Sequence, residues 1–259
     1  MSDYIADILE RFNDDGHYYA DRDFLSNSSL KLLEESPTKF FLWKQNKWKQ
    51  KSNDAFDIGH ALHAWFLEGK KVHIPYNGGR RAGADYKEFK AANEGKIVLT
   101  PSNAAIVDGM YNKLMSCPDV KPLLSQGWDA EVPMVKWYDI DGTEIGVKGK
   151  ADALLTNPDF SNTLVDLKTT RDSIDKWKRN AKWNYARQAY LYADMFGVKD
   201  FAFLVVQKEF PYDVGYFYCS PEFLDFGRRE FERSMRMYKE LFIDNVEEFN
   251  SYQAIKGVL

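Results

Sequence analysis

Cysteine, histidine and long apolar runs are all scarce in this sequence. The two cysteines, Cys117 and Cys219, lie far apart and in no CxxC spacing, which argues against a disulfide framework and a cysteine-ligated cluster. No window approaches the roughly eighteen apolar residues that a membrane-spanning helix needs. The N-terminal segment is acidic where a secretory signal would be basic and then apolar. We therefore expect an intracellular protein without membrane segments.

An excess of positive charge is absent as well. The formal net charge of the 259 residues is -4, which argues against nucleic-acid binding over the whole surface. Two segments are nevertheless basic: residues 36 to 53 hold five lysines and no acid, and residues 164 to 187 hold seven bases against three acids. Such segments can follow a phosphate backbone. Solvated helix faces have the same composition, so both interpretations stay open.

The 259 residues and the 44% hydrophobic content suffice for one sizeable core, so we expect a single domain over residues 1–259. Periodicity and caps predict helices from about residue 28, from Pro37, over 57–69, from Pro101 to before Pro118, over 181–196 and from Pro221. Alternation predicts short strands within 130–155 and strands at 163–169, 201–207 and 215–219. This order is typical of an α/β fold with a central mixed sheet flanked by helices. The core motifs span about 57–220, with extra N-terminal helices and a C-terminal helical segment over 221–259.

Two consecutive expected strands carry the residues with chemical potential. Asp152 lies in the first, and Asp166 and Lys168 lie in the second. Because Asp166 and Lys168 are two residues apart, their side chains leave the same face, while their neighbours point into the opposite layer. If the strands form a hairpin centred on Asp159, Asp152 and Asp166 lie opposite each other, with Cβ atoms about 4.5–5.5 Å apart.

Two carboxylates at that spacing can share one hard divalent cation such as Mg²⁺. Lys168 would then orient a water and stabilise the negative charge that develops when a phosphodiester is hydrolysed. An isolated D-x-K is usually a surface feature. The preceding Asp152, the strand context and the helix that follows favour a metal-dependent hydrolytic site here.

Other polar residues leave their roles open. Gln188 and Tyr192 lie at i and i+4 on one helix face, where the glutamine can bond a phosphate and the tyrosine can stack on a base or fix the glutamine. The alternative is an ordinary amphipathic helix with a tyrosine at its edge. Glu131 is either a third acid of the site or a strand-edge residue. A lone helical histidine is more often a surface or core residue than a ligand; the four histidines are His17, His60, His63 and His73.

The order Asp152, then Asp166-x-Lys168, then Gln188-x-x-x-Tyr192 resembles the RecB-like branch of the PD-(D/E)XK nucleases. More closely, five segments are together similar to the nuclease domain of the exonuclease VIII (RecE) family: SNSSLKLLEESPTKFFLW, DIGHALHAWFLEG, DYKEFKAANEGKIVLT, GKADALL and VDLKTT. The resemblance runs from about residue 24 to 220. Each motif alone is weakly specific, whereas five in the same order are strongly specific.

The resemblance implies a restriction-endonuclease-like core with Mg²⁺ as cofactor, for which Mn²⁺ can substitute. It further implies a 5'-to-3' exonuclease that digests double-stranded DNA from its ends and leaves 3' single-stranded tails for a single-strand annealing protein in phage-type recombination. A phage or prophage origin, and with it the cytoplasm of a bacterial host, follows from the same resemblance.

Carried over by position, the resemblance assigns catalytic roles to Asp152, Asp166, Lys168, Gln188 and Tyr192. It assigns metal ligation to His63, Asp152, Asp166 and the backbone carbonyl of Leu167. Spacing on the helix does not separate His60 from His63, and only the family position selects His63.

DNA contacts are expected in two regions. Ser26 and Ser29 match the family's S-x-S segment, where contact with DNA is expected. The candidate phosphate contacts are Arg80, Arg81, Arg171, Lys176 and Arg187. For Glu68, the choice between metal ligation and a structural role stays open.

The chain also departs from the family. The long N-terminal region of the larger relatives is absent, so we expect a stand-alone nuclease core, and two cysteines cannot hold the iron-sulfur cluster of some RecB-like relatives. Two alternative functions remain: a structure-specific or single-strand endonuclease on the same site, and a catalytically silent DNA-binding module. A processive enzyme of net charge -4 would benefit from enclosing its substrate, so we expect a ring-shaped homo-oligomer. Related branches form a trimer and a tetramer, and the closer motifs favour the tetramer.

Overall fold

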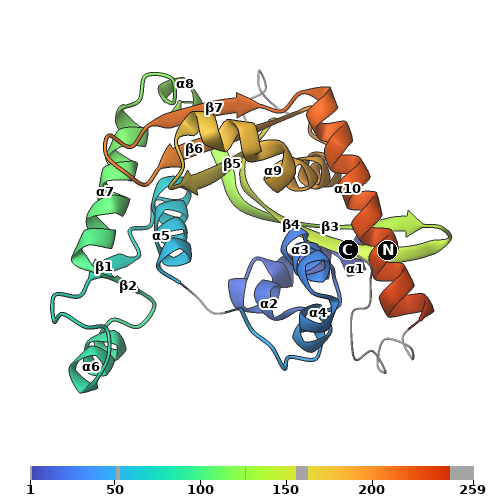
Figure 1. Ribbon diagram of the computed structural model, residues 1–259, viewed down its shortest axis with the longest axis horizontal. Coiled ribbons are helices and arrows are strands. Elements are labelled where there is room, and N and C mark those ends of the chain that lie inside the picture. The colour runs from blue at the N-terminus through green and yellow to red at the C-terminus, as the bar shows by residue number, and fades with distance from the viewer. Residues whose placement is uncertain (1, 51–52, 126, 156–162, 246–259) are drawn as a thin grey trace, which may run out of the picture.

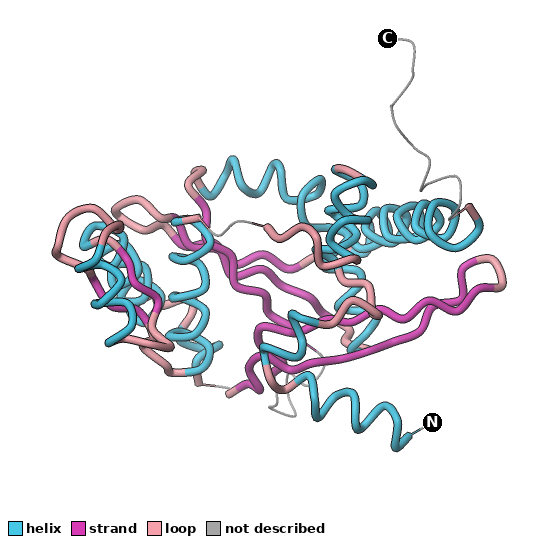
Figure 2. The backbone as a smooth tube through the Cα atoms, turned by 90° about the horizontal axis from the view of Figure 1, so that it is seen from below, coloured by secondary structure: helices cyan, strands magenta, loops and turns pink. Residues whose placement is uncertain are grey.

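The computed structural model describes residues 2–50, 53–125, 127–155 and 163–245. Its centre is a five-stranded sheet with helices on both sides (Figures 1 and 2). The order is β3-β4-β5-β6-β7, in which β5 and β6 run parallel and the other neighbours are antiparallel. The strands are β3 (Trp128–Ile140), β4 (Thr143–Leu155), β5 (Thr163–Thr170), β6 (Asp200–Gln207) and β7 (Val214–Tyr218). The predicted central mixed sheet is confirmed.

The β3–β4 hairpin is longer than the short strands that the sequence predicts. Each strand has 13 residues, and the turn falls at Asp141-Gly142, where φ is 49° and 80°. Asp-Gly is the pair that a two-residue hairpin turn with positive φ at both central positions favours. The strands stay regular because they pair with each other along nearly their whole length, a long-range effect that local alternation does not reveal.

Helices form the layers on both faces of the sheet. On one face α9 (Ile174–Phe196) packs Trp177 and Ala189 against strand residues that include Phe203. On the other face α5 (Asp54–Glu68) and α7 (Pro101–Ser116) pack Leu62 and Met110 into a core with the strands. A smaller lobe below α7 contains the parallel strands β1 (His73–Pro75) and β2 (Ile97–Leu99) with α6 (Ala84–Ala92). Helix α8 (Lys121–Leu124) follows α7 at its other end, near β7.

The N-terminal helices lie across from α5, below the sheet in Figure 1. They are α1 (Ser2–Phe12), α2 (Asp15–Ala20), α3 (Asn27–Glu35) and α4 (Pro37–Lys44). The chain after α2 returns to the sheet through Leu25, whose backbone pairs with both Gly146 and Lys148 of β4. This tie holds the N-terminal helices beside the middle of the sheet.

Most predicted helix starts agree with the structure, and one does not. Ser220 caps α10 (Pro221–Lys239), as its sequence predicts. Helix α9 begins at Ile174, well before the predicted residue 181, because Ser173 caps it and Trp177 is buried against the sheet. Gly227 lets α10 cross α9 closely, since a Cβ there would lie 2.0 Å from the Ala186 carbonyl oxygen.

Some expectations lie outside the described residues: the turn centred on Asp159, Lys51 of the first basic segment, and the C-terminal segment from residue 246 onward. Between Pro221 and residue 245 the predicted C-terminal helix is present, followed by the short π-helical segment Glu240–Asp244. No helix in the described part of the chain is long and apolar enough to cross a membrane.

Candidate active site

The strand pair β4–β5 brings the two predicted aspartates together. The antiparallel register joins Ala153 to Val165 and Leu154 to Leu164, and the next step of that register is Asp152 opposite Asp166. At this point the Asp152 carboxylate, rather than a strand carbonyl, accepts the Leu167 N–H at 2.8 Å. The side chain of Asp152 therefore lies at the junction of the two strands, where the ladder stops.

Asp166 is held by two side chains of different charge. Its carboxylate is fully buried, and one oxygen lies 2.5 Å from the Lys168 ammonium. The other oxygen accepts a hydrogen bond of 2.6 Å from the Gln188 amide. Asp166 and Lys168 thus share one face of β5, as the two-residue spacing predicts, and α9 supplies Gln188 to fix the carboxylate.

Three potential metal ligands converge beside this pair. One ligand atom each from His63, Glu131 and Asp152 lies within 4.8 Å of the others, and the distance from His63 Nδ1 to the Asp152 oxygen is 3.5 Å. A nitrogen and two carboxylate oxygens form a donor set that suits a divalent ion. Hydrogen bonding of His63 to the Leu167 backbone also places that peptide group at the site.

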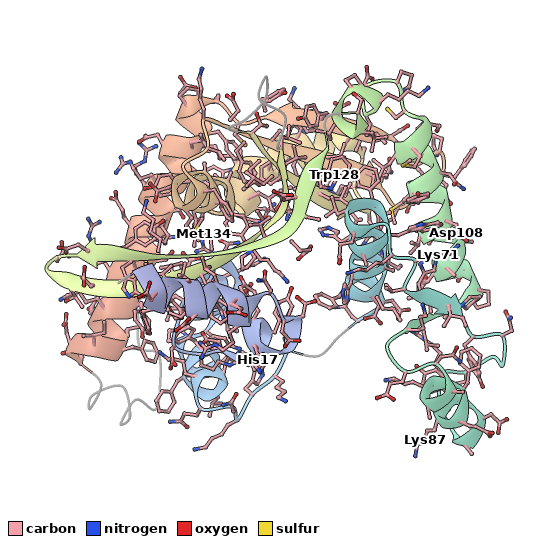
Figure 3. All side chains as sticks on the ribbon, turned by 180° about the vertical axis from the view of Figure 1, so that it is seen from behind. His17, Lys71, Lys87, Asp108, Trp128 and Met134 are labelled. Carbon is pink, nitrogen blue, oxygen red and sulfur yellow. The ribbon has the colours of Figure 1, made fainter. Side chains whose placement is uncertain are left out.

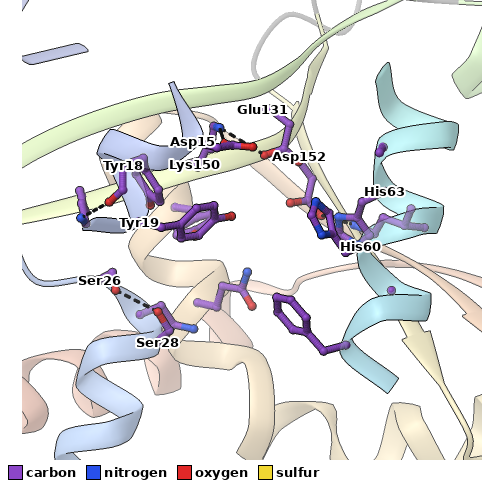
Figure 4. Close-up of a pocket in the computed structure, with 18 of the residues that line it drawn as sticks. Asp15, Tyr18, Tyr19, Ser26, Ser28, His60, His63, Glu131, Lys150 and Asp152 are labelled. Atoms are coloured by element: carbon purple, nitrogen blue, oxygen red, sulfur yellow. Dashed lines mark hydrogen bonds and ion pairs between the residues drawn. The ribbon is translucent and has the colours of Figure 1, made fainter. Parts of the chain in front are cut away.

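Glu131 reaches the site because it lies opposite Asp152 in the β3–β4 hairpin. Ala130 pairs with Ala153 and Val132 pairs with Ala151, so Glu131 and Asp152 occupy the register position between these two pairs. The φ of Glu131 is 53°, in the left-handed region, which is unusual for a residue other than glycine. Its carboxylate lies beside Asp152 and beside His63 of α5, as Figure 4 shows. The sequence leaves the role of Glu131 open because short strands predicted within 130–155 do not specify which residue lies opposite Asp152.

Burial sets the protonation states of these groups. Burial raises the pKa of Asp166 to about 6 against the opposing charge of Lys168, and it raises the pKa of Glu131 to about 7. Burial, together with the charge of Lys168, lowers the pKa of His63 to about 4, so the imidazole is neutral at pH 7 with a free lone pair. Burial disfavours the ammonium of Lys168, but the carboxylates Asp166 and Asp152 outweigh it and raise the pKa.

Tyr192 of α9 packs against β4 beside the site. Its hydroxyl hydrogen-bonds to the backbone of Lys150 on β4. Its ring fits over Gly149, where an added Cβ would lie 3.1 Å from the ring. The Gln188-x-x-x-Tyr192 pair therefore links α9 to both site strands, with Gln188 on the carboxylate of β5 and Tyr192 on the backbone of β4.

All of these side chains except the buried Asp166 line one open cleft of about 780 Å³. Its walls come from α2 and α3 on one side and α5 on the other, with the site strands and α9 at its floor. Lys150 ion-pairs with Asp15 and lies 3.8 Å from Glu131, so it couples α2 to the acids of the floor. Glu68 lines the same cleft and pairs with Lys70 at 2.7 Å.

The two predicted serines have local structural partners. Ser26 lines the cleft and caps α3, and Ser29 is buried and completes the capping box with Ser26. Their contact with DNA stays a prediction, for which Ser26 is the accessible member. On the small lobe, Arg81 pairs with Asp54 of α5, and Arg80 is exposed. Neither arginine lines the cleft.

Of the three predicted phosphate contacts in the second basic segment, one is exposed and two form ion pairs with acids. Arg171 is exposed at the end of β5. Lys176 pairs with Asp172 at 2.6 Å, and Arg187 lies 2.5 Å from Glu34 of α3. Arg187 thus ties α9 to α3 in this structure, and the expectation that it binds DNA is not tested by this contact.

A solved structure shares this fold. A crystal structure from Eubacterium rectale, provisionally named an exonuclease, aligns with a TM-score of 0.59 at 15% identity, over 93% of this chain and 92% of that one. The crystal structure of SSO0001 aligns at 15% identity over 81% of this chain and 84% of that one, with a TM-score of 0.36. Among curated proteins, no sequence matches.

At the level of sequence families, residues 26–251 match the family described as a PDDEXK-like domain of unknown function. The match includes both site strands, His63 and the Gln188–Tyr192 pair. The predicted PD-(D/E)XK class is confirmed, whereas the narrower resemblance to the exonuclease VIII family is not tested by this match. The chain belongs to the PDDEXK-like family DUF3799.

Proposed function

We propose that this protein is a metal-dependent nuclease that hydrolyses DNA phosphodiester bonds. The observation that supports this most is the convergence of His63, Glu131 and Asp152 within 4.8 Å, beside the ion pair of the buried Asp166 with Lys168. A catalytically silent DNA-binding module has no evident need for a buried carboxylate, a paired lysine and a neutral histidine in one cleft.

The residues have separable roles in this mechanism. His63, Glu131 and Asp152 would hold the ion, and Asp166 and the Leu167 carbonyl complete the set expected from the PD-(D/E)XK resemblance. A divalent ion such as Mg²⁺ supplies positive charge against the phosphate and lowers the pKa of water. Lys168 donates hydrogen bonds to the attacking water and to the negative charge that develops on the phosphate. Gln188 keeps Asp166 in place.

In finer terms, we propose a 5'-to-3' exonuclease that acts on double-stranded DNA ends and leaves 3' single-stranded tails for an annealing protein. The support is the ordered set of five motifs similar to the exonuclease VIII family, together with the provisional name of the Eubacterium rectale protein. The cleft is open to solvent beside the N-terminal helices, so a DNA end can reach the site strands directly.

Digestion of a linear duplex labelled at one 5' end, beside a covalently closed circle, tests both levels of the proposal. We expect loss of the 5' label first, release of mononucleotides or short products, and an intact circle, all dependent on Mg²⁺ or Mn²⁺. Cutting of the circle, or of single strands alone, would instead support the endonuclease. No cleavage of any DNA form with either metal would support the silent module.

We also propose that the active form is a ring-shaped homo-oligomer, with a tetramer favoured. The support is the net charge of -4, which gives weak general attraction for DNA and makes enclosure the simplest route to processivity. Light scattering at micromolar concentration should report about four chains. A monomer that degrades long duplex processively would contradict the ring.

A further inference from the structure

Two aromatic side chains in the cleft are exposed. Tyr19 of α2 has 65% of its surface exposed, and Phe56, in the first turn of α5, has 64% exposed. Both line the cleft that contains Asp152 and Lys168. They come from its two opposite walls, since α2 and α5 face each other across it (Figure 4).

Folding does not explain why these two rings face solvent. In α2 the neighbour Tyr18 is buried, and in α5 the residue Ile58 is buried, so each helix has already placed its apolar face in a core. Tyr19 contacts the edge of Tyr18 at 5.2 Å, and Phe56 contacts His60 at 6.1 Å between ring centroids. Each ring therefore has an aromatic neighbour on the protein side and remains open toward the cleft.

Most of the charge in the cleft between the rings is already paired. Asp15, Glu68, Glu131 and Asp152 line the cleft, and so do Lys148, Lys150 and Lys168, each of which forms an ion pair with an acid. A phosphate backbone gains little from paired charges, so a contact with another part of the nucleotide would add affinity for the DNA near the site. Nucleobases stack on aromatic side chains regardless of sequence, which makes a free ring face a general contact for DNA.

We infer that Tyr19 and Phe56 bind unpaired nucleobases, and that the cleft takes the end of a duplex after its terminal nucleotides have separated. This rests on the proposed nuclease function and specifies its substrate. Inside a duplex both faces of each base are already stacked, and a blunt end offers a single free face, so rings on two opposite walls can both be used only by unpaired bases. The two walls hold the separated strand while the phosphodiester lies over the floor.

Equilibrium binding measures this directly. In a Lys168→Ala background, which keeps DNA intact, fluorescence anisotropy compares a blunt duplex with duplexes carrying about five unpaired nucleotides at the 5' or the 3' end. We expect the tailed duplex that enters the cleft to bind about 10-fold more tightly than the blunt one. Tyr19→Ala and Phe56→Ala should each remove most of that preference, whereas Tyr19→Phe should retain it.

Tyr4→Ala is the matched control, because Tyr4 is 60% exposed but lies on α1, outside the cleft. It should leave the preference unchanged. A 2-aminopurine base in the tail adds a direct readout: its fluorescence should be quenched on binding and recover in Phe56→Ala. Thermal unfolding checks that the alanine variants remain folded, as their exposure predicts.

Equal affinity for blunt and tailed duplexes, or a preference that survives both alanine substitutions, would overturn the inference. That result is distinguishable from failure of the proposed function. If the wild-type protein cuts DNA in Mg²⁺ but shows no stacking signature, only the base-binding role falls. If it cuts no DNA form, the nuclease itself is wrong.

Discussion

At the scale of single residues, Asp166 is the most constrained group of the site. Its carboxylate is fully buried and receives both the Gln188 amide and the Lys168 ammonium. Burial disfavours the ionised carboxylate and raises the pKa of Asp166, whereas the positive charge of Lys168 lowers it. Asp166 and Lys168 therefore depend on each other, and their substitution should have different consequences.

We expect Asp166→Ala and Lys168→Ala both to abolish cleavage but to differ in metal binding. Loss of Asp166 should weaken binding of Mn²⁺ and leave Lys168 without its ion-pair partner. Loss of Lys168 should spare metal binding and lower the rate by about 100-fold or more, because it removes stabilisation of the transition state only. Calorimetric titration with Mn²⁺ separates the two, and near-normal cleavage by Lys168→Ala would exclude the lysine from the mechanism.

Metal affinity should also test whether Glu131 and His63 are ligands. Glu131→Gln keeps the size of the side chain but removes its charge, and His63→Ala removes the imidazole. Each should raise the Mn²⁺ concentration needed for half-maximal binding by about 10-fold or more. His60→Ala is the control, because His60 lines the cleft but is not among the three converging ligands. A stronger effect from His60 than from His63 would reverse the assignment.

The sequence predicts part of this site and misses another part for a physical reason. Asp152, Asp166 and Lys168 follow from the two-residue repeat of a strand and from antiparallel pairing. Glu131 enters the site through its position opposite Asp152, which depends on how β3 pairs with β4. Charge alone also gives no indication that Arg187 pairs with Glu34, because the two residues are far apart in the chain.

At the scale of elements, α9 has two faces with different functions. Gln188 and Tyr192 face the site strands, whereas Lys178, Arg179 and Lys182 are exposed. None of these three cations forms an ion pair within the described part of the chain. No acid lies between Trp177 and Tyr185 in the sequence. The predicted phosphate contacts of this segment, Lys176 and Arg187, are instead paired with acids.

We expect the exposed face of α9 to contact the DNA backbone. Lys178→Ala, Arg179→Ala and Lys182→Ala should each weaken duplex binding and reduce the slope of log K against log salt by roughly 0.9. Lys87→Ala is the control, since Lys87 lies on α6 in the small lobe (Figure 3). Three variants with an unchanged salt dependence would show that this face does not bind phosphate.

Helix boundaries illustrate what local sequence can predict. Ser26, Ser36 and Ser220 cap their helices, and the sequence indicates helix starts at or beside each. The first turns of α9 are missed because their surface is highly charged, and only burial of Trp177 against the sheet reveals the helix. Caps act through adjacent residues and can be predicted, whereas packing partners are distant in the chain and cannot.

At the scale of the whole molecule, the acids of the cleft make stability depend on metal and pH. Burial raises the pKa of Glu131 to about 7 from its ordinary value of 4.5. Without metal, the folded protein therefore favours the protonated carboxyl, and this stabilising contribution is fully present below pH 4.5 and is lost as pH rises through about 7. The metal-free protein should lose about 1 kcal/mol of unfolding free energy from this group between about pH 6.5 and 8.

Chemical denaturation in a chelator, at several values between about pH 6.5 and 8, measures this loss. His63 acts in the opposite direction: its pKa is lowered from 6.5 to about 4 on folding, so its contribution to stability rises as the unfolded imidazole loses its proton near pH 6.5. The comparison with Glu131→Gln therefore isolates the contribution of Glu131. Glu131→Gln cannot ionise and should flatten the pH dependence. Added Mn²⁺ should stabilise the wild-type protein more at the upper end of the window, because the ion binds the ionised carboxylate. The same pH slope in wild type and Glu131→Gln would place the titrating group elsewhere, and a metal effect that is equal at both ends would remove Glu131 from the ligands.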